Sequence, residues 1–423
     1  MNILIIGGGG REHALLWKIA QSPLADKCYA IPGNPGMEAL AVCDASISIE
    51  DNEALVAYAK EKGIGLVVVG PEVPLTNGVA DAFEAAGIPV FGPSKSAAEI
   101  EGSKAFSKNL MAKYDIPTAK YAVFTDGEEA RTYIRKEGAP IVIKADGLAA
   151  GKGVIVAMTE REALDAIGDI MDDKSFGTAG SRVVVEEFME GEEMSLLAFT
   201  DGETIIPMVP SQDHKRALDG DRGPNTGGMG TYAPAPVGTA DIVQEAYEKV
   251  LRPTVDAMKA EGRPYKGCLY AGLMVTETGV KVVEFNCRFG DPETQVVLPL
   301  LDSDLVKIML ACDKGTLSEE SVAWKDGAAV CVVMAAGGYP GSYDKGDVIT
   351  GIEESEHAGC LVFHAGTKAA DGSVVTNGGR VLGVVGEAED IRSAVKKAYD
   401  GVEKIHFKDA FYRKDIAHRA LNR

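Results

Sequence analysis

The chain has 423 residues, 46% hydrophobic and 25% charged, so it is long enough for about three soluble domains with ample cores. Its 63 acidic and 43 basic residues give a net charge of −20, which opposes nucleic acid and anionic membranes as partners, so a phosphate-bearing ligand must be small and held by local Lys and Arg. The seven cysteines form no C-x-x-C pair and no apolar run reaches membrane-spanning length, so we expect a cytoplasmic protein with reduced thiols.

The N-terminal residues predict a strand, a glycine turn and a helix. Residues 2–7 are apolar, and residues 11–21 carry apolar positions at helical spacing. A dinucleotide-binding turn needs a third glycine, but counting on from Gly7 and Gly9 leads to Glu12, which disfavours a nicotinamide or flavin oxidoreductase. The turn and the helix N-terminus can still present amides to an anion.

The same alternation continues to about residue 95 and predicts a doubly wound parallel sheet. We expect a helix over 52–62, a strand over 66–70, a turn at PEVP, a further helix and a strand at PVFG. The turns at 32–36 and 70–72 follow the second and fourth strands, at the carboxyl ends where open sheets bind ligands. Simple turns are the alternative for each.

A second mixed unit follows an expected helix from about 94 to 114. IVIKADG and VIVAM predict strands around the loop GLAAGKG, which is not a Walker loop because a glycine stands where Ser or Thr should hold the metal. The glycines and two flanking lysines favour phosphate binding over a plain flexible hairpin. The candidate residues are Lys144, Gly151, Lys152 and Gly153.

An acidic link joins the two strands expected in RVVVEEFMEGEEMSLLAF. Such a link is a solvated hinge in most proteins. Here, backbone groups near Glu186 and Phe188 could pair with an adenine edge, and Glu193 could bind ribose hydroxyls.

Residues 211–231 predict a long polar loop, and loops of this length tend to be functional or disordered. The loop contains Asp213, His214 and Lys215, and its glycine-rich end, 225–230, can offer several backbone amides. His214 suits a polar contact better than a metal site, because no other histidine is near it in sequence.

The stretch 281–295, KVVEFNCRFGDPETQ, begins as an alternating strand after the strand GCLYAGLMVTE. Glu284 and Asn286 share one face about 7 Å apart, and Mg²⁺ takes one or two such protein oxygens together with substrate phosphates. Arg288 follows in the turn, where a planar fork of donors suits a terminal phosphate. An edge strand with a polar face is the alternative.

Past residue 325 the pattern changes to short strands and glycine-rich turns, closed by a helix over 391–405. These features predict a separate α+β lobe.

In this order the motifs resemble the ATP-grasp superfamily, and within it the purine-biosynthesis ligases that join glycine to 5-phosphoribosylamine. The similarity covers nearly the whole chain, from GGGGREHALLWK through GPEVPL, EGSKAF, IVIKADGLAAGKGV, SQDHKR, GPNTGGMG and EFNCRFGDPETQ to RKDIAHRAL. It implies an α/β protein with a parallel N-terminal domain over 1–101, an ATP-grasp region over 102–325 with a mobile lid at about 121–190, and a C-terminal α+β domain over 326–423.

The resemblance also implies ATP and Mg²⁺ or Mn²⁺ as cofactors, and we expect glycyl phosphate as the intermediate and a monomeric protein. Glu284 and Asn286 would bind metal, Lys104 and Lys144 the ATP phosphates, and Arg288 the transferred phosphate. Glu186, Phe188 and Glu193 would hold the nucleoside. The amino-acid site would fall at Asp213, Lys215, Asn225, Thr226, Gly227 and Gly228, and the sugar-phosphate site at the N-terminal turns with Gly10 and Asn34.

Two alternatives share this nucleotide site. A bicarbonate-using purine carboxylase of the same superfamily should lack the SQDHKR and GPNTGGMG loop, and a non-catalytic nucleotide-binding module should have lost Glu284, Asn286 or Arg288. The chain contains both loop motifs and all three of these residues. The chain departs from the wider superfamily in the strand LYAGLM, which offers no carboxylate where many members place another metal ligand.

Overall fold

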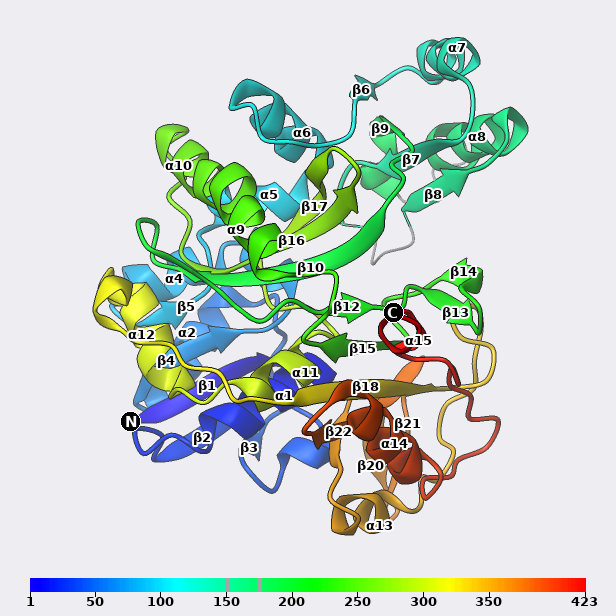
Figure 1. Cartoon of the computed structure of the whole chain (residues 1–423). Coiled ribbons are helices and arrows are strands. Elements are labelled where there is room, and N and C mark those ends of the chain that lie inside the picture. The colour runs from blue at the N-terminus through cyan, green and yellow to red at the C-terminus, as the bar shows by residue number, and fades with distance from the viewer. Residues whose placement is uncertain (149–152, 173–176) are drawn as a thin grey trace.

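The computed structural model describes residues 1–148, 153–172 and 177–423, and its first 101 residues form the predicted doubly wound sheet (Figure 1). Five parallel strands lie in the order β3-β2-β1-β4-β5. They are β1 (Asn2–Gly7), β2 (Lys27–Pro32), β3 (Val42–Cys43), β4 (Ile64–Val69) and β5 (Val90–Phe91). The helices are α1 (Gly10–Ile19), η1 (Pro35–Met37), α2 (Asn52–Glu61), α3 (Glu72–Thr76) and α4 (Val79–Ala85).

Alternate residues of β1 face different helices, as a doubly wound sheet requires. Ile3 and Ile5 share a core with Leu15 of α1, whereas Leu4 and Ile6 share one with the side chains of α2 and α4. One detail differs from the prediction: PEVP begins the short helix α3 instead of forming a turn. Its proline at position 74 lies in the first helical turn, where a missing N–H costs no helical hydrogen bond.

The helix predicted from 94 to 114 is two helices, α5 (Lys95–Gly102) and α6 (Lys104–Lys113). Ser103 between them is extended, with φ −137° and ψ 113°. Its hydroxyl accepts a 3.1 Å hydrogen bond from the Phe106 amide and donates one of 3.1 Å to Asp146. Such a cap stabilises a helix by about 1 kcal/mol, and here it places Lys104 at the first position of α6.

The sheet within residues 121–187, the 121–187 sheet, has its own hydrophobic core, which includes Ile134, Ile143, Ile167 and Val185. Its strands lie in the antiparallel order β6-β9-β7-β8. They are β6 (Tyr121–Phe124), β7 (Ile141–Ala145), β8 (Val154–Ala157) and β9 (Val183–Glu187). The helical segments are α7 (Gly127–Glu137), α8 (Glu160–Ile167), η2 (Gly168–Asp172) and η3 (Gly177–Ser181).

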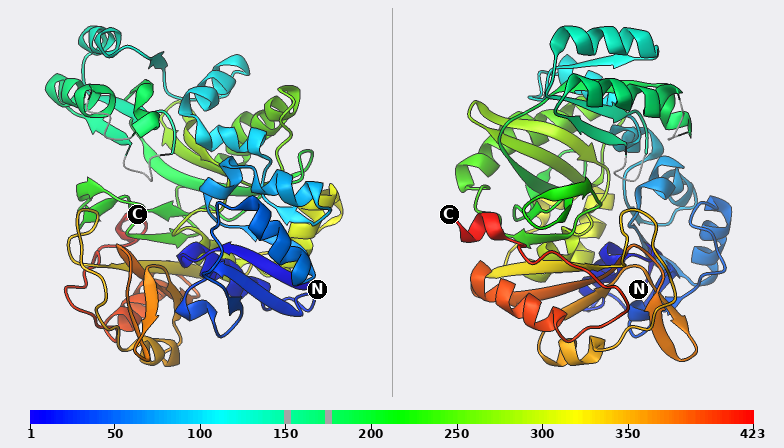
Figure 2. Two further views of the ribbon diagram at one scale, coloured as in Figure 1. Left: turned by 180° about the vertical axis from the view of Figure 1, so that it is seen from behind. Right: turned by 90° about the vertical axis from the view of Figure 1, so that its right-hand side faces the viewer.

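A central antiparallel sheet lies between the 121–187 sheet and the N-terminal and C-terminal sheets (Figure 2). Its strand order is β11-β10-β16-β17. The strands are β10 (Glu192–Thr200), β11 (Ile205–Pro207), β16 (Gly267–Thr276) and β17 (Gly279–Asn286). The helical segments of this part of the chain are α9 (Ala240–Ala246), η4 (Tyr247–Leu251), α10 (Arg252–Ala260), α11 (Thr294–Val297), η5 (Leu298–Leu300), α12 (Leu305–Lys314) and η6 (Leu317–Glu319). Of these, α11 and η5 pack against α1 and the C-terminal sheet.

The alternation predicted along β17 is interrupted by a bulge. Gly272 pairs with Glu284 and Leu273 with Val282, so Val283 is an extra residue. A regular strand would place Val283 on the same face as Phe285, but Val282 and Phe285 are the buried residues here and Val283 is only partly buried. From Glu284 onward the alternation holds, and Glu284 and Asn286 lie on one face as predicted.

The C-terminal residues form a sheet that also includes two strands from the middle of the chain. The order is β12-β15-β18-β22-β19, and two hairpins, β13-β14 and β20-β21, lie outside it. The strands are β12 (Gln212–Asp213), β13 (Arg216–Leu218), β14 (Arg222–Asn225), β15 (Gly230–Ala233), β18 (Ala328–Ala335), β19 (Leu361–His364), β20 (Thr367–Ala370), β21 (Ser373–Thr376) and β22 (Arg380–Ala388). The helices are α13 (Ile352–His357), α14 (Ile391–Val402) and α15 (His418–Leu421).

The prediction of an irregular loop over 211–231 is therefore wrong. The Asp219-Gly220 pair turns the chain between β13 and β14, a hairpin signal that the polar composition obscured. The strands at the two ends of the segment, β12 and β15, pair with each other, and β15 also pairs with β18, which lies about 100 residues later in the chain. No helix within the described residues is long and apolar enough to cross a membrane.

Candidate active site

Glu284, on the edge strand β17, is the point toward which four basic side chains converge. Burial raises the pKa of its carboxyl, but the charges of Lys144, Lys104, Lys215 and Arg288 outweigh burial and lower it. These cations come from strand β7 of the 121–187 sheet, the first position of α6, the link between β12 and β13, and the turn after β17. The fold thus brings together five predicted site residues from four separate segments of the chain.

Two oxygen donors on β17 fit a small hard cation. Glu284 is opposite Gly272, and Asn286 is 8% exposed two residues further along the same face. No group of three or more His, Cys, Asp or Glu side chains in the described parts of the chain could hold a metal ion. A carboxylate and an amide oxygen match Mg²⁺ or Mn²⁺ only where substrate phosphates complete the coordination, as they do in nucleotide sites.

Arg288 is fixed by carboxylates on both sides. Its Nη2 lies 2.9 Å from Glu101 and 3.1 Å from Asn286 Oδ1, and its Nε lies 3.4 Å from Glu72. Burial lowers the pKa of the guanidinium, but Glu101 and Glu72 outweigh burial and raise it. Glu101 also accepts a 2.7 Å hydrogen bond from the Cys287 amide, so it fixes both the side chain and the backbone of this turn.

Glu186 does not present a free carboxylate to a nucleoside. Its side chain is 3% exposed, with one oxygen 2.9 Å from Lys108 and the other 3.0 Å from Lys144. Lys144 also donates a 3.0 Å hydrogen bond to the carbonyl of Val283. Burial lowers the pKa of Lys108 to about 8. Sequence reasoning missed Lys108, although it follows Lys104 at the i+4 spacing that shares one helix face.

The other predicted nucleotide residues lie around this cluster. Lys104 donates a 3.2 Å hydrogen bond to the Gly147 carbonyl at the start of the glycine-rich loop. Gly151 and Lys152 lie outside the described residues, and the Gly153 carbonyl accepts a hydrogen bond from Ala145. The roles of Phe188, half-buried just after β9, and Glu193, exposed on β10, stay predictions.

Asp213 and Lys215 form an ion pair of 2.6 Å beside a second carboxylate. Burial raises the pKa of Asp213 although Lys215 opposes the rise, and Asp213 in turn adds to the rise that burial causes in the pKa of Glu293. Burial lowers the pKa of Lys215, but Asp213, Tyr270, Glu293 and Glu284 outweigh burial and raise it well above its usual value. Tyr270 donates a 2.7 Å hydrogen bond to Glu293. Glu293 and Tyr270 were not predicted; the acidic turn GDPETQ was the available signal.

Comparison with known proteins agrees with this geometry. Models of phosphoribosylglycinamide synthetase match the chain in order, the N domain over residues 1–101, the ATP-grasp (A) domain over 102–294 and the C domain over 329–419. The chain belongs to the phosphoribosylglycinamide synthetase family. A phosphoribosylamine–glycine ligase of Vibrio cholerae is 55% identical over 426 residues, covering 100% of this chain and 99% of that protein.

Solved structures agree with this family assignment and show that the fold also occurs outside the family. The phosphoribosylamine–glycine ligase of Thermotoga maritima matches with a TM-score of 0.85 and 37% identity, over 99% of this chain and 100% of that one. The biotin carboxylase domain of Hydrogenobacter thermophilus 2-oxoglutarate carboxylase matches with a TM-score of 0.73 and 18% identity, over 97% and 91% of the two chains. At that identity the likeness concerns the ATP-grasp fold alone, and the carboxylase alternative is not favoured.

Within this phosphoribosylglycinamide synthetase fold, the glycine-rich end of the 211–231 segment packs onto Lys215. Asn225 pairs with Arg216 across the β13-β14 hairpin. The Thr226 hydroxyl donates a 2.8 Å hydrogen bond to the Lys215 carbonyl and accepts one of 3.0 Å from the Gly228 amide. The Gly227 amide donates to the hydroxyl of a tyrosine at position 339. These contacts order the backbone beside the Asp213–Lys215 pair.

The N-terminal turn of this family member is tied to the C-terminal sheet. Asn34 donates hydrogen bonds of 2.9 Å to the Gly8 carbonyl and 3.0 Å to the His364 carbonyl, and its Oδ1 accepts one of 3.2 Å from the Met37 amide. A Cβ at Gly10 would lie 2.7 Å from a side-chain nitrogen of Gln295. Asn34 and Gly10 therefore hold the turn together, and their contacts with a sugar phosphate stay predictions.

Proposed function

We propose that this protein joins glycine to 5-phosphoribosylamine to give glycinamide ribonucleotide, with conversion of ATP to ADP and phosphate. One observation carries the proposal: Glu284 is surrounded by both the expected nucleotide-binding cations, Lys104 and Lys144, and by Lys215 of the expected glycine site. A γ-phosphate held by the first two would lie beside a carboxylate held near the third, as phosphoryl transfer to an amino acid requires.

The proposed reaction has two steps. The glycine carboxylate attacks the γ-phosphorus of ATP and ADP leaves, which gives glycyl phosphate. The amine of 5-phosphoribosylamine then attacks the acyl carbon, and phosphate leaves as the amine loses a proton. A free carboxylate is a poor electrophile at neutral pH, whereas its mixed anhydride has a good leaving group. Holding anhydride and amine together can contribute about 7–11 kcal/mol through proximity.

The residues divide this work between them. Arg288, Lys104 and Lys144 stabilise charge on the transferred phosphoryl group. Asp213 and Lys215 offer opposite charges to the zwitterion of glycine. Mg²⁺ or Mn²⁺, held by Glu284 and Asn286 with the phosphates, would neutralise phosphate charge. No Ser, Cys or His nucleophile is needed.

Oxygen-isotope transfer tests this proposal. The protein is incubated with Mg-ATP, glycine labelled with ¹⁸O in its carboxylate, and 5-phosphoribosylamine, and the released phosphate is analysed by mass spectrometry. Glycyl phosphate transfers one labelled oxygen to phosphate. Unlabelled phosphate released together with glycinamide ribonucleotide would overturn the acyl-phosphate step, and absence of ADP release with these substrates would overturn the function.

We also propose the division of the chain at 1–101, 102–325 and 326–423, a lid at about 121–190, a cytoplasmic location and a monomeric state. The separate hydrophobic core of the 121–187 sheet supports the lid. The seven cysteines, all free, suit a reducing compartment. Light scattering during gel filtration tests the monomer, and replacing glycine with bicarbonate tests the carboxylase alternative, for which ADP release would continue.

A further inference from the structure

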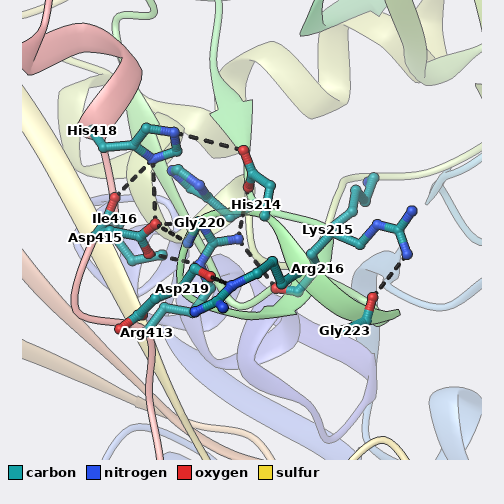
Figure 3. A network of polar contacts seen from close by, with 12 residues as sticks. His214, Lys215, Arg216, Asp219, Gly220, Gly223, Arg413, Asp415, Ile416 and His418 are labelled. Atoms are coloured by element: carbon teal, nitrogen blue, oxygen red, sulfur yellow. Dashed lines mark hydrogen bonds and ion pairs between the residues drawn. The ribbon is translucent and has the colours of Figure 1, made fainter.

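The C-terminal segment 413–423 lies against the β13-β14 hairpin (Figures 1 and 3). The two regions are nearly 200 residues apart in sequence, and an Arg413 to Arg216 contact spans 197 residues. The hairpin belongs to the polar segment that carries Asp213 and Lys215. Contacts at this place therefore act on the proposed glycine site from outside it.

Arg413 is the centre of these contacts, and its side chain is 0% exposed. Its Nη1 donates hydrogen bonds of 2.9 Å to Asp221 and 3.2 Å to the Arg216 carbonyl. Its Nε and Nη2 each donate one of 2.8 Å to Asp415. Asp415 in turn accepts a 2.8 Å hydrogen bond from the Gly220 amide in the hairpin turn. One buried guanidinium thus joins strand β13 and the hairpin turn to the C-terminal segment.

His214 is the second contact, and it lies between Asp213 and Lys215 in sequence. Its Nε2 accepts a 3.0 Å hydrogen bond from the Ala417 amide. Burial, together with the charge of Arg413, lowers the pKa of His214 to about 3, so the ring is neutral and Nε2 remains an acceptor. Ala417 has φ +68°, a conformation that alanine adopts only where surrounding contacts impose it.

The backbone of His214 is also fixed. Its amide donates a 2.9 Å hydrogen bond to Gly230, and its carbonyl accepts one of 2.8 Å from Met229. Neighbouring side chains of an extended segment point to opposite sides. Figure 3 shows His214 directed toward the C-terminal segment and Lys215 directed away from it. Holding the His214 ring therefore sets the direction in which Asp213 and Lys215 point.

We propose that segment 413–423 positions the Asp213–Lys215 pair, with His214 and Arg413 as positioning residues. The inference rests on the proposed function, in which that pair binds glycine. It assigns a role in substrate binding to residues that touch neither nucleotide-binding cation. It also explains why an arginine is fully buried at the end of the chain, where a charge is costly without such partners.

Two substitutions of His214 test the role in catalysis. His214→Gln keeps an acceptor near the position of Nε2, whereas His214→Leu leaves the Ala417 amide unpaired. The loss of this hydrogen bond corresponds to a change of about tenfold or more in an equilibrium constant. We expect His214→Leu to raise KM for glycine at least about tenfold with KM for ATP within about twofold, and His214→Gln to restore most of the difference. His357→Leu, an exposed histidine on α13, is the matched control.

A second readout needs no substrate. The side chain of Lys215 is 38% exposed and held by Asp213, so a looser pair should react faster with an amine-modifying reagent. Mass spectrometry should show several-fold faster labelling of Lys215 in His214→Leu, with unchanged labelling of the exposed Lys368. If His214→Leu does not fold, Arg419→Gln, which removes a 2.8 Å contact with Asp221, serves in its place.

The outcomes are distinct. Lys215 labelling equal to that of the wild type would overturn the positioning role. A KM for glycine that is unchanged, or that rises together with KM for ATP, would also overturn it. A wild-type protein that releases no ADP with glycine would overturn the proposed function alone, because the labelling experiment still decides whether the C-terminal segment holds the pair.

Discussion

Lys108 and Glu186 form an ion pair of 2.9 Å in which both side chains are only 3% exposed, and the other oxygen of Glu186 lies 3.0 Å from Lys144. The carboxylate, on β9, thus joins helix α6 to strands β7 and β9 of the 121–187 sheet. Because burial removes all three groups from water, each depends on the others for compensation of its charge.

Replacing Glu186 with Gln should therefore destabilise the protein strongly. Two buried lysines would lose their counter-charge, and breaking a buried pair in this way costs about 3–5 kcal/mol. We expect a clear fall in Tm, measured by circular dichroism. Glu187→Gln is the control, because that side chain is exposed and its contact with Lys281 is 3.6 Å, a surface pair worth about 0–1 kcal/mol. Equal Tm values for the two variants would contradict the prediction.

Lys108 should make stability depend on alkaline pH. Its pKa is about 8 in the folded protein and 10.5 in the unfolded chain, so between these values the unfolded state binds more protons. Its contribution to the free energy of unfolding must therefore rise as pH rises from 8 to 10.5. The denaturant midpoints of wild type and Lys108→Met should therefore move apart as pH rises across this window. Lys60→Met is the control, and parallel curves for Lys108→Met would refute the prediction.

Glu284→Gln should abolish most turnover while the fold survives. The change keeps the shape of the side chain but removes the charge that would balance Mg²⁺ and the four surrounding cations. We expect kcat for ADP release to fall at least about 100-fold. Glu277→Gln, exposed in the turn between β16 and β17, is the control. A near-normal kcat at ordinary Mg²⁺ concentrations would show that Glu284 is not a metal ligand.

Arg288→Lys should show that the planar fork matters as well as the charge. A lysine cannot contact Glu101, Glu72 and Asn286 at once, so its ammonium would not be held where the transferred phosphate is expected. Loss of such a donor lowers kcat by about 10²–10³-fold. Steady-state kinetics should show this with little change in KM for ATP. Arg161→Lys, a 92% exposed arginine, is the control, and a similar kcat in both variants would argue against the role.

The C-terminal contacts should weaken in acid. Burial raises the pKa of Asp221 and of Asp415, but the hydrogen bonds from Arg413 outweigh burial and lower both from 3.8. Their contribution to stability is present above pH 3.8 and is lost as pH falls through the lower folded values. The Tm of Asp415→Asn should approach that of wild type as pH falls below 3.8. Asp344→Asn, 87% exposed, is the control; a constant gap for Asp415→Asn would contradict the prediction.

Local patterns were enough to predict the N-terminal sheet and the strand pair β16-β17. In β1, alternate residues pack against helices on both faces, so positions 3–6 must all be apolar, and that run is visible without knowledge of distant partners. The shared face of Glu284 and Asn286 follows from strand alternation in the same way. The bulge at Val283 does not, because it depends on pairing with Gly272.

The sequence alone determined the family, the fold class and the residues that carry charge toward the proposed site, because motifs and periodicity are local properties of the chain. Only the tertiary structure decided which charges meet. Glu186 binds Lys108 and Lys144, Glu101 binds Arg288, and Arg413 reaches Asp221. Such pairs join distant segments, and the burial that makes each charge depend on its partner exists only once the sheets have packed together.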